Sequence, residues 1–455
     1  MNAQGNTIVT RRGRRVAIAL ALLATSLLFT ASAGAATLRS EFYGIVQTAT
    51  LDPQDELGMQ AAGVHANRFI LNWVWVEPTQ NHFDWGSSDR FIGELASRGI
   101  RSVPSIWGNP EWVAGGAATP PTGGLKSQQQ WRNLLKALVT RYGPGGAYWA
   151  GKYHQQFGAT AVPLPITSWQ IWNEPNVKKF FTPYPSPGQY ARLLQISAPA
   201  IKSIDPRAQI GLAGMPGYGD VTAWDFLKKL YAVGGIKAFF DAAALHPYAR
   251  DLSQFRQEIQ RVRNVIKGHG DAATPLWISE LAWGSAPPDS IGINKGPAGQ
   301  ARMLTRAFKL VLANRTAWNV QHLFWYHWRD PKRSQASCSF CGSAGLLNFN
   351  RTPKPALRAF KAFSTDKIKP KVTITAGPPQ GSTIADPTPT FKFTASELGS
   401  TFLCKFDAKP FLACASPFTP KAALANGPHT FSVRAVDAAG NASVIVSRSF
   451  RVNTH

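Results

Sequence analysis

The chain has 455 residues, of which 44% are hydrophobic and 16% charged, with 15 Trp and 26 Phe. This composition excludes wholesale disorder, and the length suits one large and one small domain, because single cores stop growing near ~250–300 residues. The net charge of +24 is accompanied by no Lys/Arg run, zinc-finger spacing or RNA-binding signature, so we expect no specific nucleic-acid partner.

Residues 1–36 have the pattern of an export signal. A cluster of Arg residues at positions 11–15 precedes an apolar run over 16–29, and small residues follow over 31–36. This pattern predicts a cleavable signal peptide. The apolar run is too short for a membrane span of ~20 residues, so we expect a secreted protein with no membrane association after cleavage. The Arg11–Arg12 pair leaves the general and the twin-arginine export routes both open.

Short apolar runs alternate with helical patterns from Glu41 to about Phe363. We expect strands at Phe42–Val46, Ala66–Asn72, Arg101–Ile106, Ser168–Trp172, Gln209–Ala213, Asp241–Leu245, Leu276–Ser279 and Val320–Trp325. We expect helices at Asp89–Gly99, Gln129–Tyr142, Gln189–Ile204, Trp224–Val233, Ser253–Lys267 and Ala298–Ala313. About eight such units predict an α/β fold of the (β/α)8 TIM barrel type over residues 37–366. An open doubly wound sheet is the alternative.

The composition changes after Lys369 to short alternating runs separated by Pro, Thr, Ser and Gly, which predicts a small all-β sandwich over residues 367–455. The segments Phe402–Asp407, Phe411–Pro417, Gly427–Phe431 and Asp437–Asn441 resemble the immunoglobulin-like modules at the ends of bacterial exported proteins. The resemblance covers roughly 85 residues and implies a spacer or adhesion role without chemistry.

The four Cys residues form two local pairs, Cys338/Cys341 and Cys404/Cys414. Export to an oxidising compartment makes disulfides the default, and we favour the local pairing because each pair lies in a different predicted domain. A Cys-x-x-Cys pair is also found in zinc and thiol redox sites. Zinc, however, needs about four ligands, and no second pair is nearby in the sequence, so we expect no metal and no cofactor.

Two of the nine Glu residues lie at the carboxyl ends of predicted strands. Glu174 ends the strand Ser168–Trp172 and is followed by Pro175, which cannot donate to a sheet ladder, while Glu280 ends Leu276–Ser279. At ~30 residues per βα unit they lie about three units apart, on strands four and seven of a barrel. Strand ends of this kind meet at the carboxyl face, where barrel active sites are built. Two carboxyl groups ~5–5.5 Å apart would support hydrolysis with retention, and ~6.5–9.5 Å would support inversion.

The run Trp-Asn-Glu-Pro-Asn at 172–176, with the Glu after strand seven, resembles glycoside hydrolase clan A, families 39 and 5 in particular. The resemblance covers roughly residues 41–363. It implies that Glu174 is the general acid/base, Glu280 the nucleophile, and Asn173 a ligand of the sugar 2-hydroxyl. Family 5 usually has a His soon after strand three, whereas this chain has Ile106–Asn109 there, which weakens the likeness to family 5.

The same resemblance implies four further substrate-site residues. Arg68 would keep Glu280 ionised, His246 and Tyr248 would form a polar pair beside the nucleophile, and Trp325 would be the sugar platform. Each has an alternative: a surface ion pair for Arg68, a structural turn for the His246–Tyr248 segment, and Trp328 as the stacking ring instead of Trp325.

Together these observations predict an exported retaining glycosidase that cleaves O-glycosidic bonds of a polysaccharide or oligosaccharide with two Glu residues. The alternative is a non-catalytic cell-wall or glycan-binding protein on a barrel scaffold. A strongly basic exported protein suits an acidic cell-wall polymer as a second partner, and therefore also a location at the cell wall. A solvated basic surface without a dedicated partner explains the charge equally well.

Overall fold

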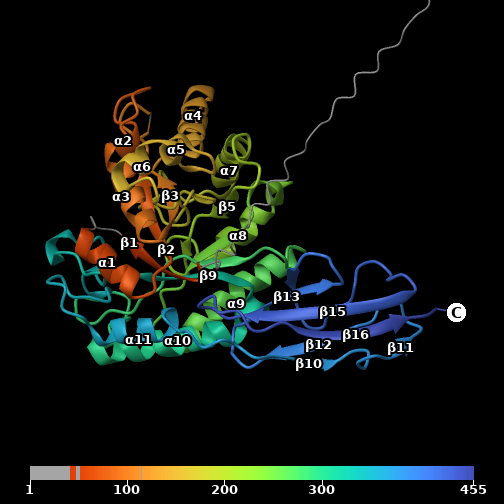
Figure 1. The fold of residues 1–455 in the computed structure, drawn as a ribbon. Helices are drawn as coiled ribbons and strands as arrows, with labels where there is room; N and C mark the ends of the chain where they lie inside the picture. The colour runs from red at the N-terminus through yellow and green to blue at the C-terminus, as the bar shows by residue number, and fades with distance from the viewer. Residues whose placement is uncertain (1–40, 48–51, 114, 455) are drawn as a thin grey trace, which may run out of the picture. The chain divides into compact units, whose positions relative to one another are not determined.

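A computed structural model describes residues 41–47, 52–113 and 115–454 (Figure 1). The predicted signal peptide over residues 1–36 lies outside these ranges. Within them, no helix combines the length and the apolar character that a membrane span requires.

Parallel strands form a ring in the larger part of the chain (Figure 1). Its strands are β1 (Tyr43–Gln47), β2 (Ala66–Asn72), β3 (Arg101–Trp107), β4 (Ser168–Ile171), β5 (Gln209–Leu212), β6 (Met215–Pro216), β7 (Ala243–His246), β8 (Leu276–Ile278) and β9 (Val320–Tyr326). They are ordered β5-β4-β3-β2-β1-β9-β8-β7-β6, and a parallel bridge between Gly211 and Ala242 joins β5 to the residue before β7. The predicted (β/α)8 barrel is confirmed, with β6 as a two-residue addition.

Helices connect these strands. They are α1 (Pro53–Ala61), α2 (Trp73–Val76), α3 (Gly86–Ser97), α4 (Leu125–Tyr142), α5 (Ala147–Ala150), α6 (Lys152–Phe157), α7 (Pro187–Lys202), α8 (Ala223–Tyr231), α9 (Leu252–Gly268), α10 (Gly296–Trp318) and α11 (Pro355–Ser364). Short 3-10 turns lie at Ile236–Phe239, Arg333–Gln335 and Cys341–Ser343. All six predicted helices are present. The sequence reasoning missed α1 because this helix buries Asp55 and Glu56 beside Met59, so no apolar stripe marks it.

The barrel interior combines an apolar wall with a polar centre. Strands β4, β7 and β8 are buried along their whole length, as parallel strands covered by helices are. Arg68, Gln170 and His246 are nevertheless 0% exposed and lie on three of the ring's strands. Buried polar groups need partners, so these three residues locate the centre of the site.

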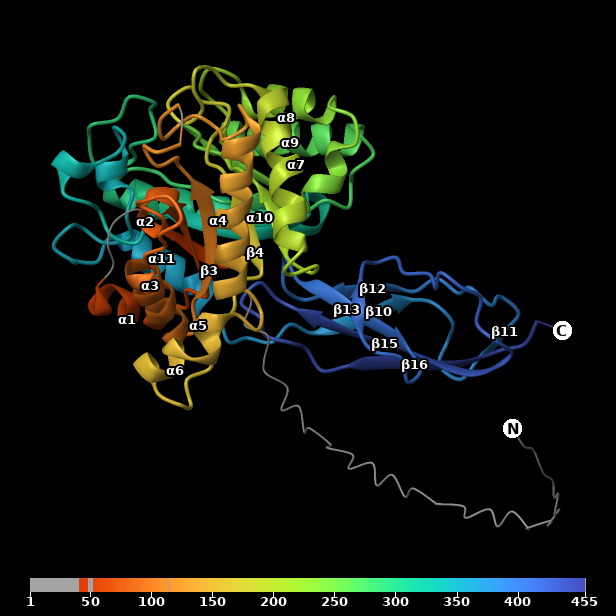
Figure 2. The same ribbon diagram turned by 90° about the horizontal axis from the view of Figure 1, so that it is seen from above.

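The C-terminal part is all-β (Figure 2). Strands β10 (Val372–Ala376) and β12 (Lys392–Ala395) form one small antiparallel sheet. The second sheet contains β11 (Thr383–Ile384), β13 (Thr401–Phe406), β14 (Leu412–Cys414), β15 (Gly427–Val436) and β16 (Val446–Val452). Phe391 and Phe431 stack between them with ring centroids 4.1 Å apart, which forms a sandwich core. The sandwich is confirmed, and its likeness to immunoglobulin modules stays a prediction.

Both local Cys pairs are disulfides. Cys404–Cys414 joins the neighbouring strands β13 and β14, and Cys338–Cys341 lies in the segment between β9 and α11. Helix α11 ends at Ser364 and β10 begins at Val372. The predicted domain boundary at 366–367 lies between these elements.

Candidate active site

Arg68 connects three strands of the barrel. Its guanidinium donates to Glu280 Oε1 at 2.5 Å, to Asn173 Oδ1 at 2.7 Å and to Gln170 Oε1 at 2.6 Å. The side chain is fully buried, so the surface ion pair that we considered from the sequence does not describe it. A planar guanidinium has donors in fixed directions, and three simultaneous bonds therefore fix β2 and the ends of β4 and β8 relative to one another.

Glu174 follows β4 on a strained backbone. Trp172 has a φ of 72° and Glu174 a φ of 42°, both in the left-handed region that side chains disfavour by ~1–3 kcal/mol each. The Glu174 N–H donates to the Gly214 carbonyl at 3.1 Å, and the Trp172 indole donates to the Phe180 carbonyl at 2.7 Å. These bonds hold a conformation that turns Glu174 out of the strand direction, and such strain is concentrated at functional sites.

His246, at the end of β7, lies between the two carboxylates. Its Nδ1 is 2.8 Å from Glu174 Oε1 and 3.7 Å from Glu280 Oε2. One carboxylate oxygen from each Glu lies within 4.8 Å of the other. This upper limit agrees with the ~5–5.5 Å of double displacement with retention and lies below the ~6.5–9.5 Å that leaves room for an inverting water.

Gly214 makes room for His246. A Cβ at position 214 would lie 1.9 Å from His246 Nε2 and 2.5 Å from Ser279 Oγ. No side chain fits there without displacing the imidazole, because contacts of this length are far inside van der Waals distance. Glycine at position 214 therefore leaves the space that His246 occupies when it contacts Glu174.

Tyr248 completes the surroundings of Glu280. Its hydroxyl donates to Glu280 Oε2 at 2.5 Å, and the residue is 4% exposed. Glu280 thus receives an Arg68 hydrogen bond on one oxygen and a Tyr248 hydrogen bond on the other. The segment His246–Tyr248 does turn after β7, but both of its polar side chains reach the carboxylates.

These contacts separate the two carboxylates electrostatically. Burial raises the pKa of Glu280, and the Arg68 charge and the Tyr248 hydroxyl oppose that rise. Burial also raises the pKa of Glu174, and the negative charge of Glu280 raises it further. Burial, reinforced by Arg68, holds the pKa of His246 well below its usual value, so the ring is neutral. The arrangement can therefore keep a proton on Glu174 while Glu280 is ionised, as an acid and a nucleophile require.

Glu174, His246 and Glu280 are also a set that could hold a metal ion, since one ligand atom from each lies within 4.8 Å of the others. The Arg68 guanidinium is already bonded to Glu280. A fixed positive charge at that distance opposes a second cation, so the donor set suits proton transfer and nucleophilic attack better than metal binding.

Trp325, the predicted sugar platform, is 0% exposed. Its indole N–H donates to the Ala344 carbonyl at 3.0 Å, and its ring lies 6.3 Å from that of Trp283. These contacts join it to the barrel wall, and its stacking role stays a prediction. Trp328 is 2% exposed.

Three residues near the carboxylates escaped sequence reasoning. Gln170 is a buried polar residue between Trp169 and Ile171 on β4, a signal that could have been used. Tyr218 is 41% exposed, its ring lies 6.4 Å from that of Tyr248, and burial and the charges of both Glu residues raise its pKa. Tyr326, at the end of β9, lies 6.2 Å from Tyr248. Tyr218 lies in the connection between β6 and α8, and Tyr326 precedes the long segment between β9 and α11, where sequence patterns carry little information.

The chain resembles known glycosidases. The family model for glycosyl hydrolases family 39 matches residues 77–370, a range that includes all the site residues above except Arg68. A β-xylosidase of Caldicellulosiruptor saccharolyticus is 24% identical over 318 residues, which are 63% of this chain and 57% of that protein. One of Geobacillus stearothermophilus is 24% identical over 305 residues, 61% and 55% of the two chains. The chain thus spans little more than half the length of these curated relatives.

Solved structures share the fold. A family 39 glycoside hydrolase from Bacteroides cellulosilyticus WH2 superposes with a TM-score of 0.54 at 16% identity, covering 92% of this chain and 80% of that one. A monomeric β-xylosidase from Caulobacter crescentus CB15 gives 0.54 at 16% identity, covering 87% and 73%. At such identities the likeness concerns the fold alone.

Proposed function

The chain belongs to glycosyl hydrolases family 39, and from this premise we propose that it is an exported retaining glycosidase that uses Glu174 and Glu280. The observation that carries the proposal is the short distance between the two carboxylates, within 4.8 Å, with Arg68 bonded to only one of them. This geometry supports a nucleophile and an acid within reach of one anomeric carbon.

In the first step Glu280 attacks the anomeric carbon while Glu174 gives its proton to the departing glycosidic oxygen. In the second step Glu174 takes a proton from water, whose oxygen attacks the same carbon and releases Glu280. The neutral His246, 2.8 Å from Glu174, can orient this carboxyl group in both steps without competing for its proton. Two inversions at one carbon give net retention.

Asn173 is suited to hold the sugar. Its Oδ1 accepts a hydrogen bond from Arg68, so the side-chain amide is fixed, and no described residue accepts from its N–H groups, which can donate to the substrate. A hydrogen bond to the 2-hydroxyl that strengthens in the transition state would lower the barrier. We propose β-xylosides as the substrate class, because the two curated relatives described above are β-xylosidases.

Export agrees with the two disulfides and with the predicted signal peptide. We propose that the protein acts outside the cell. The basic charge suits attachment to an acidic cell-wall polymer, and the C-terminal sandwich would then be a spacer or an adhesion module.

The test is hydrolysis of aryl β-xylosides and xylo-oligosaccharides by the purified chain, with product anomers followed by NMR from the first minute. The β-anomer should appear first and then mutarotate. First appearance of the α-anomer would refute retention. Glycan binding without cleavage across a panel of β-glycosides would refute the enzyme and favour a binding protein.

A further inference from the structure

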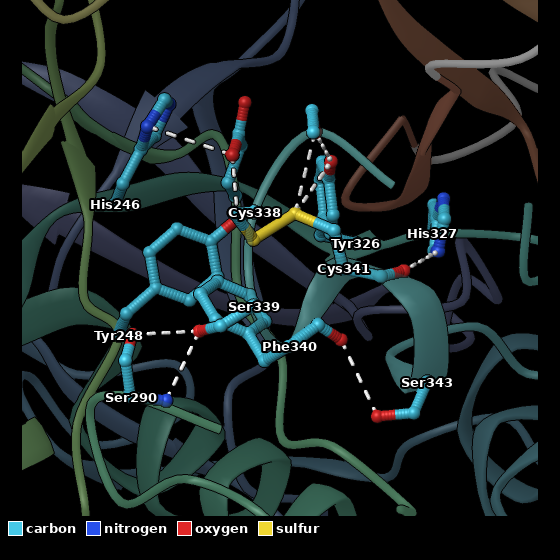
Figure 3. Close-up of a disulfide and its surroundings, with 12 residues drawn as sticks. His246, Tyr248, Ser290, Tyr326, His327, Cys338, Ser339, Phe340, Cys341 and Ser343 are labelled. Carbon is cyan, nitrogen blue, oxygen red and sulfur yellow. Dashed lines mark hydrogen bonds and ion pairs between the residues drawn. A yellow bond between two sulfur atoms is a disulfide. The ribbon is translucent and has the colours of Figure 1, made fainter. Parts of the chain in front are cut away.

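The Cys338–Cys341 disulfide lies beside the candidate active site (Figure 3). It closes the loop from Cys338 to Cys341, and the stretch Ser337–Ser343 around this loop is called the disulfide segment. Phe340 stands between the two Cys residues and is 4% exposed. A buried aromatic residue in so short a disulfide loop has few conformations available to it, because both of its ends are tied.

Phe340 packs against the tyrosine that contacts the nucleophile. The ring centroids of Phe340 and Tyr248 are 4.9 Å apart at an interplanar angle of 55°, a favourable aromatic contact. Tyr248 in turn donates to Glu280 Oε2 at 2.5 Å. Tyr248 therefore contacts both Phe340 of the disulfide segment and the proposed nucleophile Glu280.

The segment is anchored to the end of β9. The Tyr326 hydroxyl donates to Cys341 Sγ at 3.3 Å, and His327 Nε2 lies 2.9 Å from the Cys341 carbonyl (Figure 3). The ring of Tyr326 also lies 6.5 Å from Phe340. These contacts join Cys341 and Phe340 to the end of β9.

Two other loops of the site contact the same segment. Lys179, five residues after Glu174, donates from Nζ to the Ser337 carbonyl at 3.0 Å. Ser290, in the loop that follows Glu280, donates from its N–H to Ser339 Oγ at 3.0 Å. The disulfide segment thus contacts the loops that follow both carboxylates.

We propose that Phe340, held by the Cys338–Cys341 disulfide, is a positioning residue for the reaction: it keeps the Tyr248 ring where its hydroxyl bonds Glu280. The inference rests on the proposed function, in which Glu280 is the nucleophile. It assigns the disulfide segment a role in catalysis beyond holding a loop together.

The consequence is a change in the ionisation of Glu280. Among the described residues, the groups that face this carboxylate are Arg68 from β2, Glu174 after β4, His246 and Tyr248 from β7 and the turn after it, and Tyr218, whose pKa the Glu280 charge raises. The Tyr248 hydrogen bond lowers the pKa of Glu280. If the ring moves, that bond weakens, the pKa of Glu280 rises, and the acidic limb of the kcat/KM profile moves to higher pH.

The experiment compares Phe340→Ala with Phe340→Tyr, which keeps the ring, in full pH profiles on an aryl β-xyloside. We expect Phe340→Ala to lower kcat/KM by about 10- to 100-fold, as small misplacements in a site do, and to move the acidic limb upward. Phe340→Tyr should restore both. In a Tyr248→Phe background, Phe340→Ala should have little further effect, because the hydrogen bond is already gone.

A disulfide pair provides the matched control. Cys338→Ser/Cys341→Ser should reproduce the shift of the acidic limb, whereas Cys404→Ser/Cys414→Ser, which removes the sandwich disulfide, should not. If Phe340→Ala does not fold, Phe340→Leu takes its place in the same double-mutant comparison. An unmoved acidic limb, or an equal loss of activity with and without the Tyr248 hydroxyl, would overturn the proposal. An inactive wild-type chain would instead refute the proposed function, before any variant is compared.

Discussion

Arg68 and Glu280 are 212 residues apart in the chain and meet 2.5 Å apart inside the barrel, with side chains 1% and 9% exposed. The pair is too deeply buried for solvent to screen it, whereas Glu174 contacts the neutral His246. The difference in charge environment between the two carboxylates therefore begins at this one contact, and the first two predictions depend on it.

Azide should distinguish the roles of the two Glu residues. Glu280→Ala removes the nucleophile, so azide enters from the vacated face of an activated aryl β-xyloside and should give the α-xylosyl azide. Glu174→Ala still forms the covalent intermediate, so azide should attack it and give the β-xylosyl azide. Without azide, Glu174→Ala lacks the general acid and should hydrolyse substrates with poor leaving groups about 10²–10⁴-fold more slowly than wild type. The measurement is NMR of the azide products.

The exposed Glu111 is a matched control for this pair, and Glu111→Ala should behave as wild type. The same azide anomer from both active-site variants would contradict the assignment of roles.

Removal of Arg68 should change the pH profile as well as stability. Arg68 lowers the pKa of Glu280, so Arg68→Met should raise that pKa and move the acidic limb of kcat/KM upward. It also leaves a buried carboxylate without its partner, which typically costs about 3–5 kcal/mol of stability. Thermal unfolding and pH profiles measure the two effects.

Arg256→Met, at an exposed position on α9, should change neither the pH profile nor the stability. An acidic limb that stays in place in Arg68→Met would show that another group sets it.

Gly214→Ala should reduce activity by displacing a neighbour. The added Cβ would lie 1.9 Å from His246 Nε2, so the imidazole must move away from Glu174. We expect a fall in kcat with smaller change in KM, since the defect lies at the acid and not in sugar binding. Steady-state kinetics measure this split. Gly188→Ala, with open space around the added Cβ, is the control. A wild-type kcat in Gly214→Ala would contradict the prediction, because it would show that the site accommodates the added methyl group without loss of the His246–Glu174 contact.

Glu56 should destabilise the barrel as the pH rises. Burial, together with a hydrogen bond to Glu94, raises the pKa of Glu56 to about 8, and the residue is 1% exposed. Because the folded-state pKa lies above the unfolded value near 4.5, the protonated form stabilises the fold at low pH, and this stability is lost between about pH 4.5 and 8. Glu56→Gln should therefore melt higher than wild type at pH 8 and similarly at pH 4.5. An equal difference in melting temperature at pH 4.5 and pH 8 would show that the ionisation of Glu56 does not control this stability.

Much of the fold followed from local pattern. The strands expected at Ala66–Asn72, Ser168–Trp172 and Val320–Trp325 agree with β2, β4 and β9 to within one residue. Buried parallel strands are continuous apolar runs, and a pattern of this kind is visible in one dimension. Helix α1 was missed because its inner face contains carboxylates.

The site residues also fall into those that local sequence predicted and those that only the structure brings together. Glu174 was identified from the strand end Trp172–Asn176, because the sequence there contains both the polar pair and the Pro that ends the ladder. Nothing local indicates that Gln170 would accept from Arg68, or that Gly214 would leave space for His246. Those pairs join different strands, and their distances depend on how the ring closes.

The sequence by itself determined the repeated βα units, the two Glu residues at strand ends and the two local disulfides, since each depends on residues close together in the chain. Only the tertiary structure decided that Arg68 also bonds Gln170 and Asn173, and that Phe340 packs on Tyr248. The physical reason is that pKa values and ring contacts depend on distances of a few ångströms between side chains hundreds of residues apart, which packing sets and sequence patterns do not encode.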